Sequence, residues 1–210
     1  MTRIAIVDDH AIVRRGLSQI LAEFPDMAVT AECGNGQELF SSMVNEELDL
    51  VLMDISMPGR NGLDVLKQVK TMKPDLPVLI LSMHPEEQYA IRALKAGASG
   101  YITKESASDE LVVAIRKASG GGKYVSTAMA ERLATAVGSR EDQALHELLS
   151  DREHQIMCLI AAGKTVSKIA DELSLSVKTI STYRSRILIK MRLNNNAELT
   201  NYAIKCGLVN

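Results

Sequence analysis

Polar and charged residues stand directly after runs of apolar residues in the first half of the chain. Asp8 and Asp9 follow one such run and Asp54 follows another, while Ser82 and Lys104 close two more. Three carboxylates in one small pocket repel each other, so either one of them takes up a proton or the group binds a cation. Oxygen ligands of this kind suit Mg²⁺. With an ammonium and a hydroxyl beside them, the set can stabilise charge on a phosphoryl group while a carboxylate attacks it. The residue types therefore indicate phosphoryl transfer, provided that the fold brings them together.

Apolar runs that predict strands alternate with segments whose apolar residues recur at helical spacing. The predicted strands cover residues 3–7, 27–33, 48–53, 78–82 and 100–103, and a helical pattern follows each. Strict alternation predicts an α/β domain with a doubly wound parallel sheet, and right-handed crossovers favour the flavodoxin-like five-stranded order 2-1-3-4-5. In that order the first, third, fourth and fifth strands are neighbours, so their carboxyl ends bring the candidate residues to one edge.

The motifs around these residues resemble the receiver domain of bacterial two-component response regulators. The resemblance lies in residues 4–10, residues 54–59 with Gly62, Ser82, and residues 101–104. It implies that Asp54 accepts the phosphoryl group, that Lys104 contacts this group, and that Ser82 and Tyr101 form a switch pair. It also implies a Mg²⁺ ion held by Asp8, Asp9, Asp54 and the backbone carbonyl of Ser56. A further hypothesis is that Ser56, Met83 and His84 set the lifetime of the phosphorylated state by admitting or shielding water.

The remainder of the chain differs in both pattern and charge. Residues 1–124 carry 13 Lys and Arg and 17 Asp and Glu, which gives a net charge of −4. Residues 150–210 carry 9 Lys and Arg and 5 Asp and Glu, which gives a net charge of +4. After the glycines at 120–122 the strand–helix pattern stops, and later residues are helical only. We therefore predict a receiver domain over residues 1–121, a linker with a short helix over 122–146, and an all-α four-helix domain over 147–210.

The last domain has the features of a helix-turn-helix unit. Ser150 and Glu153 form a capping-box pattern, and Ser176 follows a three-residue turn and can begin a helix that runs to about Met191. Val177, Ile180, Ile187 and Met191 fall on one face of that helix, which predicts that they are core. The opposite face carries short polar residues with cations at its margins, as a helix in the major groove requires.

This domain resembles the LuxR-type helix-turn-helix of the NarL/FixJ subfamily of response regulators. The resemblance implies contacts with double-stranded DNA through residues of the second helix of the motif: Lys178, Thr179, Ser181, Thr182, Arg184, Ser185, Arg186 and Lys190. The base-reading positions match Ser181, Thr182 and Ser185, none of which can form a strong bidentate contact with a base. We therefore expect a larger share of shape readout or water-mediated contacts.

Together the two resemblances imply a transcriptional response regulator. A sensor histidine kinase would supply the phosphoryl group, Mg²⁺ would be the cofactor, and the protein would be no enzyme beyond its own phosphorylation and dephosphorylation. The phosphorylated or DNA-bound form is expected to be a homodimer. No run of 18 apolar residues is present and the Cys33, Cys158 and Cys206 thiols show no metal-ligand spacing, so we expect a cytoplasmic protein without a membrane partner.

Two other classes of function remain open on the sequence. A phosphohydrolase with an aspartate nucleophile shares the acid, metal and lysine chemistry, but it would want a second acid two residues after the nucleophile, where this chain has Ser56. A ligand-sensing regulator could carry the same DNA-binding domain, but it would leave Asp8, Asp9, Asp54 and Lys104 unexplained. A nucleotide-binding domain is disfavoured because no glycine-rich phosphate loop follows the first strand.

Overall fold

The computed structural model describes residues 1–57, 61–131 and 144–209 of the chain. These residues divide into two compact units, Met1–Ala130 and Glu131–Asn210. Within the described segments, no helix combines the length and the apolar character that crossing a bilayer demands.

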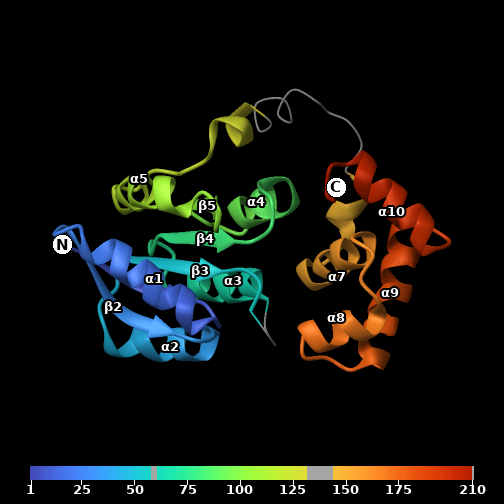
Figure 1. The fold of residues 1–210 in the computed structure, drawn as a ribbon, viewed down its shortest axis with the longest axis horizontal. Coiled ribbons are helices and arrows are strands. Elements are labelled where there is room, and N and C mark those ends of the chain that lie inside the picture. Colours follow the sequence, from blue (N-terminus) through green and yellow to red (C-terminus); the bar gives the residue numbers. More distant parts are fainter. Residues whose placement is uncertain (58–60, 132–143, 210) are drawn as a thin grey trace. The chain divides into compact units, whose positions relative to one another are not determined.

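The first unit is built on a parallel sheet of five strands in the order β2-β1-β3-β4-β5 (Figure 1). The strands are β1 (Thr2–Val7), β2 (Met27–Cys33), β3 (Leu50–Asp54), β4 (Val78–Ser82) and β5 (Gly100–Thr103). Every residue of β3 and β4 is buried, which explains why these strands are nearly continuous in apolar residues. The predicted topology is confirmed. The observed strand limits differ most from the predicted ones at β3. This strand begins at Leu50 and includes Asp54, whereas residues 48–53 were predicted.

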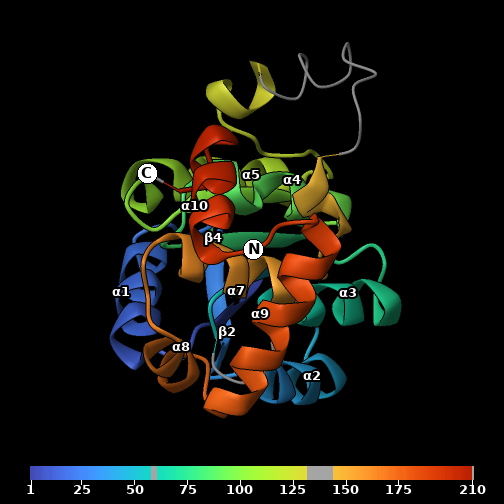
Figure 2. The ribbon, with the colours of Figure 1, turned by 90° about the vertical axis from the view of Figure 1, so that its right-hand side faces the viewer.

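Helices cover both faces of this sheet. They are α1 (Ala11–Ala22), α2 (Gly36–Asn45), α3 (Gly62–Met72), α4 (Glu86–Lys95) and α5 (Ala107–Ser119). Leu21 of α1 and Ile115 of α5 share one buried cluster with Ile4 and Leu52 of the sheet. Figure 2 shows α1 on one side of the strands and α2 and α3 on the other. With both faces covered, only the strand ends are free to form a polar site.

The chain continues to pack on the first unit after α5. The N–H of Tyr124 donates to the carbonyl of Ser99 at 2.7 Å, and Tyr124 forms an isolated parallel bridge with Gly100. A Cβ atom at Gly100 would lie 2.7 Å from the carbonyl oxygen of Tyr124, so glycine permits this close approach. Met129, in a helical segment that begins at residue 127, is also buried. The compact unit therefore extends beyond residue 121, while residues 132–143 of the predicted linker lie outside the described part of the chain.

In the second unit, the described residues 144–209 form helices and no strand. A 3-10 turn, η1 (Leu145–Leu148), precedes α7 (Asp151–Ala161), α8 (Val166–Glu172), α9 (Val177–Met191) and α10 (Asn196–Lys205). The predicted capping box is confirmed, since Ser150 accepts from the N–H of Glu153 and the Glu153 carboxylate accepts from the N–H of Ser150. Ser176 caps α9 by accepting from the N–H of Thr179 at 3.0 Å.

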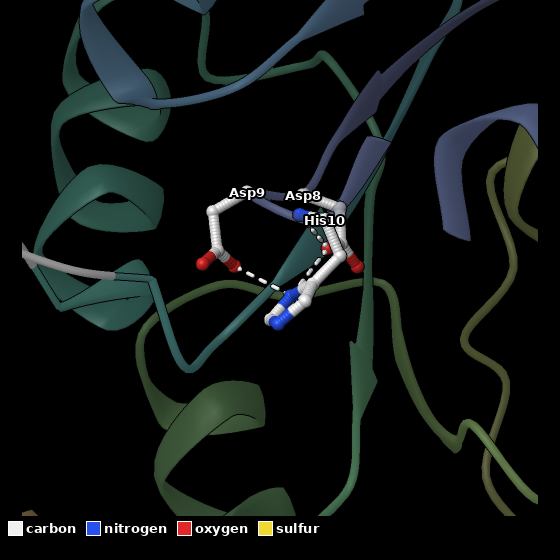
Figure 3. A group of neighbouring side chains, drawn as sticks. All are labelled: Asp8, Asp9 and His10. Carbon is white, nitrogen blue, oxygen red and sulfur yellow. Dashed lines mark hydrogen bonds and ion pairs between the residues drawn. The ribbon is translucent and has the colours of Figure 1, made fainter. Parts of the chain in front are cut away.

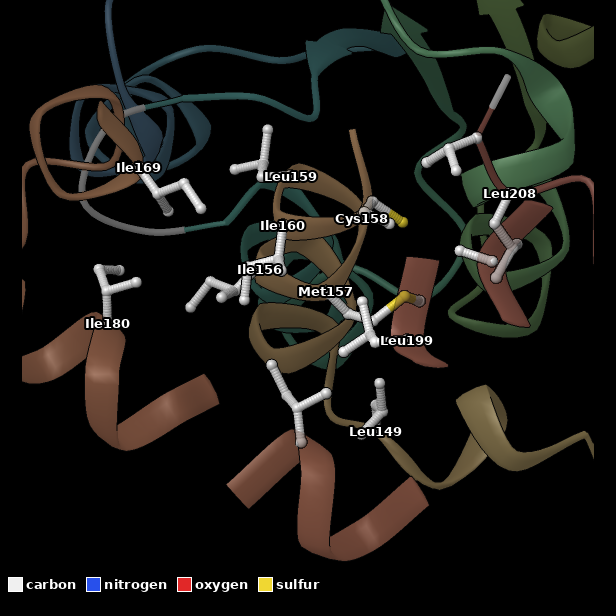
Figure 4. Close-up of a cluster of buried hydrophobic side chains, with 14 of the residues drawn as sticks. Leu149, Ile156, Met157, Cys158, Leu159, Ile160, Ile169, Ile180, Leu199 and Leu208 are labelled. Carbon is white, nitrogen blue, oxygen red and sulfur yellow. The ribbon is translucent and has the colours of Figure 1, made fainter. Parts of the chain in front are cut away.

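The core of this unit joins all four α-helices (Figure 4). Ile156, Ile169, Ile180 and Leu199 are fully buried there, one from each helix. The prediction that Val177 belongs to this core is wrong, because its side chain is 50% exposed. Val177 is the first residue of α9, and a helical Cα–Cβ bond points toward the N-terminus, so its side chain is directed beyond the packed part of the helix.

Candidate functional site

The acidic and basic side chains selected from the sequence meet at one edge of the sheet. Asp54 is the last residue of β3 and Ser82 the last of β4, and Asp8 and Lys104 directly follow β1 and β5. Ser82 pairs with Thr103 in the parallel ladder, which places Lys104 next to the end of β4. Asp8, Asp54 and Ser82 are almost completely buried. The convergence expected from the strand order is therefore observed.

Lys104 joins the two buried carboxylates. Its Nζ lies 2.6 Å from Asp8 Oδ2 and 3.1 Å from Asp54 Oδ2. Its backbone N–H donates to the carbonyl oxygen of Ser82 at 2.8 Å, which fixes the start of the side chain against β4. The ammonium is thus held by backbone and side-chain contacts at a point where it faces both acids.

Burial and ion pairing have opposite effects on the pKa values of Asp54 and Lys104. Burial and, less strongly, repulsion from Asp8 raise the pKa of the Asp54 carboxyl group, and together they outweigh the attraction of Lys104 and the hydrogen bond from the Ser56 N–H at 3.2 Å. For Lys104, burial alone would lower the pKa, but the combined attraction of Asp54 and Asp8 outweighs it and raises the pKa. The pocket therefore keeps a fixed positive charge beside a carboxylate whose charge is poorly solvated.

Asp8, Asp9 and His10 form a second cluster at the mouth of the pocket (Figure 3). One potential ligand atom from each lies within 4.8 Å of the other two. Asp8 Oδ1 accepts from the N–H of His10 at 2.8 Å. Among the described residues, Asp9 Oδ1 is shielded from solvent and has no hydrogen-bond partner. The carboxylate oxygens of this set suit a hard divalent cation such as Mg²⁺.

The loop after β3 is shaped by a glycine. The N–H of Gly62 donates to the carbonyl of Ile55 at 3.0 Å, and a Cβ atom at position 62 would lie 2.4 Å from the carbonyl oxygen of Asp54. Asn61, which is buried, caps α3 by accepting from the N–H of Leu63. The start of α3 is therefore pressed against the backbone that carries Asp54. Residues 58–60 of this loop, which belong to the receiver motif, lie outside the described residues.

The predicted switch pair is connected through the backbone of His84. The N–H of His84 donates to Ser82 Oγ at 3.1 Å, and the Tyr101 hydroxyl donates to the carbonyl oxygen of His84 at 2.9 Å. Tyr101 is buried, with 1% of its side chain and backbone exposed. The His84 ring also contacts Ser56, with Nε2 3.0 Å from Oγ, whereas Met83 is 65% exposed. The sequence selected these residues but did not predict the hydrogen bonds that join them.

The predicted DNA-binding residues of α9 fall into two groups. Lys178, Ser181, Thr182, Ser185 and Arg186 are exposed. Within this group, Thr182 Oγ1 donates to the carbonyl of Lys178 at 3.0 Å and Ser185 Oγ donates to the carbonyl of Ser181 at 3.1 Å. These hydroxyls remain on the exposed face and can still accept hydrogen bonds from a ligand.

The other predicted DNA-binding residues are engaged within the domain. Lys190 Nζ lies 2.6 Å from Glu153 Oε2, and Arg184 Nε donates to Asn196 Oδ1 at 2.7 Å. Thr179 Oγ1 lies 2.8 Å from the Oγ of Ser176. The first two contacts join α9 to α7 and α10, and the third lies at the N-terminus of α9 itself. A contact of Lys190, Arg184 or Thr179 with DNA stays a prediction.

Comparison with known proteins agrees with both resemblances. Residues 4–116 match the model of the response regulator receiver domain, and residues 147–203 match the model of the bacterial regulatory proteins of the luxR family. The chain belongs to the response regulator family. It combines a receiver domain with a LuxR-type DNA-binding domain, as the sequence predicted.

Relatives of similar length are also named response regulators. The response regulator UvrY of Escherichia coli K12 is 34% identical over 211 residues, which cover 100% of this chain and 97% of UvrY. The response regulator GacA of Pseudomonas viridiflava is 36% identical over 210 residues, 100% of this chain and 98% of GacA. A structure of RcsB from Salmonella enterica serovar Typhimurium, bound to the promoter rprA with the phosphomimetic BeF₃⁻, is similar with a TM-score of 0.67 and 26% identity. That match covers 96% of this chain and 97% of the RcsB chain.

Proposed function

We propose that this response regulator is switched by Mg²⁺-dependent transfer of a phosphoryl group from the phosphohistidine of a sensor histidine kinase to Asp54. The observation that carries the proposal is the position of Lys104, whose ammonium faces both Asp54 and Asp8 at the end of β3. An aspartate at the end of a buried strand, held beside a fixed cation, has the arrangement that a phosphoryl acceptor needs.

Asp54 acts as the nucleophile in this account. Its Oδ1 is held by the Ser56 N–H and its Oδ2 faces Lys104, so the carboxylate has a fixed orientation before the phosphodonor arrives. Because burial raises the pKa of Asp54, the carboxylate is poorly solvated, and little water has to leave it before its oxygen attacks the electrophilic phosphorus and the histidine nitrogen of the donor leaves. Lys104 stabilises the charge that develops on the phosphoryl oxygens. Mg²⁺, held by Asp8, Asp9, Asp54 and the Ser56 carbonyl, would neutralise further charge on those oxygens.

The signal passes from the pocket through Ser82, His84 and Tyr101. A phosphoryl group on Asp54 is a new acceptor for the Ser82 hydroxyl, whose oxygen now accepts from the His84 N–H. Drawing Ser82 toward Asp54 moves the β4–α4 loop and changes the carbonyl to which Tyr101 donates. Tyr101 then reorients, and the surface around α4 and β5 shifts between two states. In the same pocket, the His84–Ser56 contact restricts the approach of water and sets the lifetime of the phosphorylated form.

The output of the switch is double-stranded DNA binding by a homodimer. The exposed face of α9, with Ser181, Thr182 and Ser185 between Lys178 and Arg186, enters the major groove, and the cations contact phosphates. Two copies bind paired half-sites, as the two-fold symmetry of such operators requires. The RcsB structure, which contains a promoter and a phosphomimetic, supports a link between the receiver state and DNA binding.

The proposed chemistry is limited to the protein itself. The chain catalyses its own phosphorylation and dephosphorylation and turns over no other substrate, and we propose that it works in the cytoplasm.

Labelling from a small phosphodonor tests this proposal. The full chain should become phosphorylated in the presence of Mg²⁺ and should take up no label when Mg²⁺ is chelated before the phosphodonor is added. Asp54→Asn should take up no label, and Asp75→Asn, which changes a carboxylate far from the pocket in the sequence, should label normally. Retained labelling of Asp54→Asn would place the acceptor elsewhere, and continuous release of phosphate over many turnovers would indicate a phosphohydrolase instead.

A further inference from the structure

The imidazole of His10 lies between the two carboxylates at the mouth of the acidic pocket (Figure 3). Its Nδ1 is 3.0 Å from Asp9 Oδ1 and 3.3 Å from Asp8 Oδ1. Both contacts are at ion-pair distance, so the ring nitrogen faces one oxygen of each carboxylate. On a neutral ring, the same nitrogen is a potential metal ligand beside these two carboxylate oxygens.

The spacing of these atoms fits one metal ion bound by all of them. Transition-metal bonds to imidazole nitrogen and carboxylate oxygen are about 2.0–2.2 Å long, so neighbouring ligands are separated by about 3.0 Å in an octahedron and about 3.4 Å in a tetrahedron. The distances from His10 Nδ1 to Asp9 Oδ1 and Asp8 Oδ1 fall at 3.0 and 3.3 Å. The ring nitrogen thus already lies at the separation of a coordination edge from one oxygen of each carboxylate.

The backbone around His10 favours this role for its ring. His10 is the N-cap residue of α1, yet its side chain makes no capping hydrogen bond, so the ring is not engaged with the helix. Its backbone N–H binds Asp8 Oδ1 at 2.8 Å, which fixes the ring on the same side as the carboxylates. The side chain is 64% exposed, so the ring can complete its approach to an ion without moving the helix.

We propose that His10 is a nitrogen ligand that makes the acidic pocket select first-row transition-metal ions, such as Ni²⁺ and Co²⁺, over Mg²⁺. This inference rests on the proposed function, because it needs the pocket to bind divalent cations. Mg²⁺ takes oxygen ligands and keeps several waters, so it gains little from an imidazole. Ni²⁺ and Co²⁺ bind imidazole well, and their affinity for any such site already exceeds that for the harder ions. A transition metal would therefore compete with Mg²⁺ for Asp8 and Asp9.

Metal binding to the full chain tests the proposal, with Ni²⁺, Co²⁺ and Mg²⁺ as separate probes. Calorimetry on the Cys206→Ser background removes the half-buried thiol as a competing soft ligand. His10→Asn and His10→Gln should lower the affinity for Ni²⁺ at least about 10-fold, while the Mg²⁺ affinity changes less than about twofold. The visible absorption of bound Co²⁺ should also shift, because water replaces a nitrogen ligand. Asn at an N-cap position is well tolerated, so the variants should retain the fold.

Two control variants separate the possible results. His146→Gln, which removes an imidazole from the other domain, should leave binding of all three ions unchanged, and Asp9→Asn should weaken all three. Equal Ni²⁺ affinity and an unchanged Co²⁺ spectrum in the His10 variants would overturn the inference while Mg²⁺ binding still supports the proposed pocket. If the unchanged chain bound neither Mg²⁺ nor Ni²⁺ at Asp9, the inference and the proposed function would both fail.

Discussion

The acidic pocket and the exposed face of α9 use charge in opposite ways. In the pocket, Asp8 and Asp54 are almost fully buried and share the Lys104 ammonium within about 3 Å. On α9, Lys178 and Arg186 are exposed beside short hydroxyl side chains. The first arrangement is fixed before any ligand arrives, whereas the second is free to adapt to one.

The difference matches what the two proposed functions require. Phosphoryl transfer needs charges fixed where charge develops, and burial removes the water that would otherwise screen them. DNA binding draws much of its affinity from phosphates, which exposed cations on flexible stems can follow along the backbone. Losing one buried charge should therefore disturb both fold and chemistry, while losing one exposed charge should weaken binding alone.

The largest effect is expected for Lys104→Met. The substitution leaves Asp8 and Asp54 buried without their cation, which should cost about 3–5 kcal/mol of unfolding free energy at neutral pH. Phosphorylation by a small donor should slow by at least about 100-fold, because a fixed positive charge is lost from the reaction. Denaturant unfolding and labelling rates measure the two effects. Lys117→Met, on the exposed side of α5, should change stability by less than about 0.5 kcal/mol.

A smaller effect is expected when a methyl group is added behind Asp54. Gly62→Ala places a Cβ atom 2.4 Å from the Asp54 carbonyl oxygen, so the backbone must move, at a cost of about 2 kcal/mol. Gly16→Ala is the matched control, because a Cβ atom there meets nothing within 4 Å and helix propensity favours alanine by up to about 1 kcal/mol. Thermal unfolding measures both. A neutral Gly62→Ala would show that the close packing of α3 is not needed to hold Asp54.

The Glu153–Lys190 ion pair extends the comparison to a buried carboxylate that pairs with an exposed ammonium. Burial would raise the pKa of Glu153, but the Lys190 ammonium and the Ser150 N–H outweigh it and lower the pKa below its usual value. A carboxyl group with a lowered folded-state pKa adds stability above its unfolded value, and that stability is lost as the pH falls through the folded value. Glu153→Gln should therefore cost about 1–2 kcal/mol at pH 7, with the loss shrinking below about pH 4.5. A difference that persists at pH 3 would assign the loss to packing.

The smallest effect is expected on the exposed face of α9. Arg186→Ala should weaken DNA binding about threefold to tenfold for all sequences and reduce the slope of log affinity against log salt by about 1. Lys205→Ala, on α10, should leave both quantities unchanged. An unchanged slope of log affinity against log salt in Arg186→Ala would show that Arg186 does not contact a phosphate. It would also weaken the contrast between the two regions.

The sequence predicted the parts of this molecule that depend on local pattern. Apolar runs fixed the strands, and the strand order brought Asp8, Asp54 and Lys104 to one edge. The capping box at Ser150 was also read correctly, because its partners are three residues apart. In each case the information lies in neighbouring residues or in a general rule of chain topology.

Contacts that depend on the three-dimensional path of the chain could not be predicted in the same way. The Lys190–Glu153 ion pair spans 37 positions, and the link from Ser82 to Tyr101 runs through the His84 backbone rather than through side-chain chemistry. The approach of the His10 ring to Asp9 depends on the loop conformation after β1, which residue types alone do not specify. The packing of Tyr124 against Gly100 was missed because a polar, glycine-rich segment gives no periodic signal.

Chemical mapping of the phosphorylated residue tests the central claim most directly. Borohydride reduces an aspartyl phosphate to homoserine, so peptide mass spectrometry after phosphorylation and reduction identifies the acceptor position. The account predicts homoserine at position 54 alone. It predicts no homoserine in a sample that was incubated with the phosphodonor but without Mg²⁺. Homoserine at position 8 or 9, or a phosphorylated protein that yields no homoserine, would contradict it.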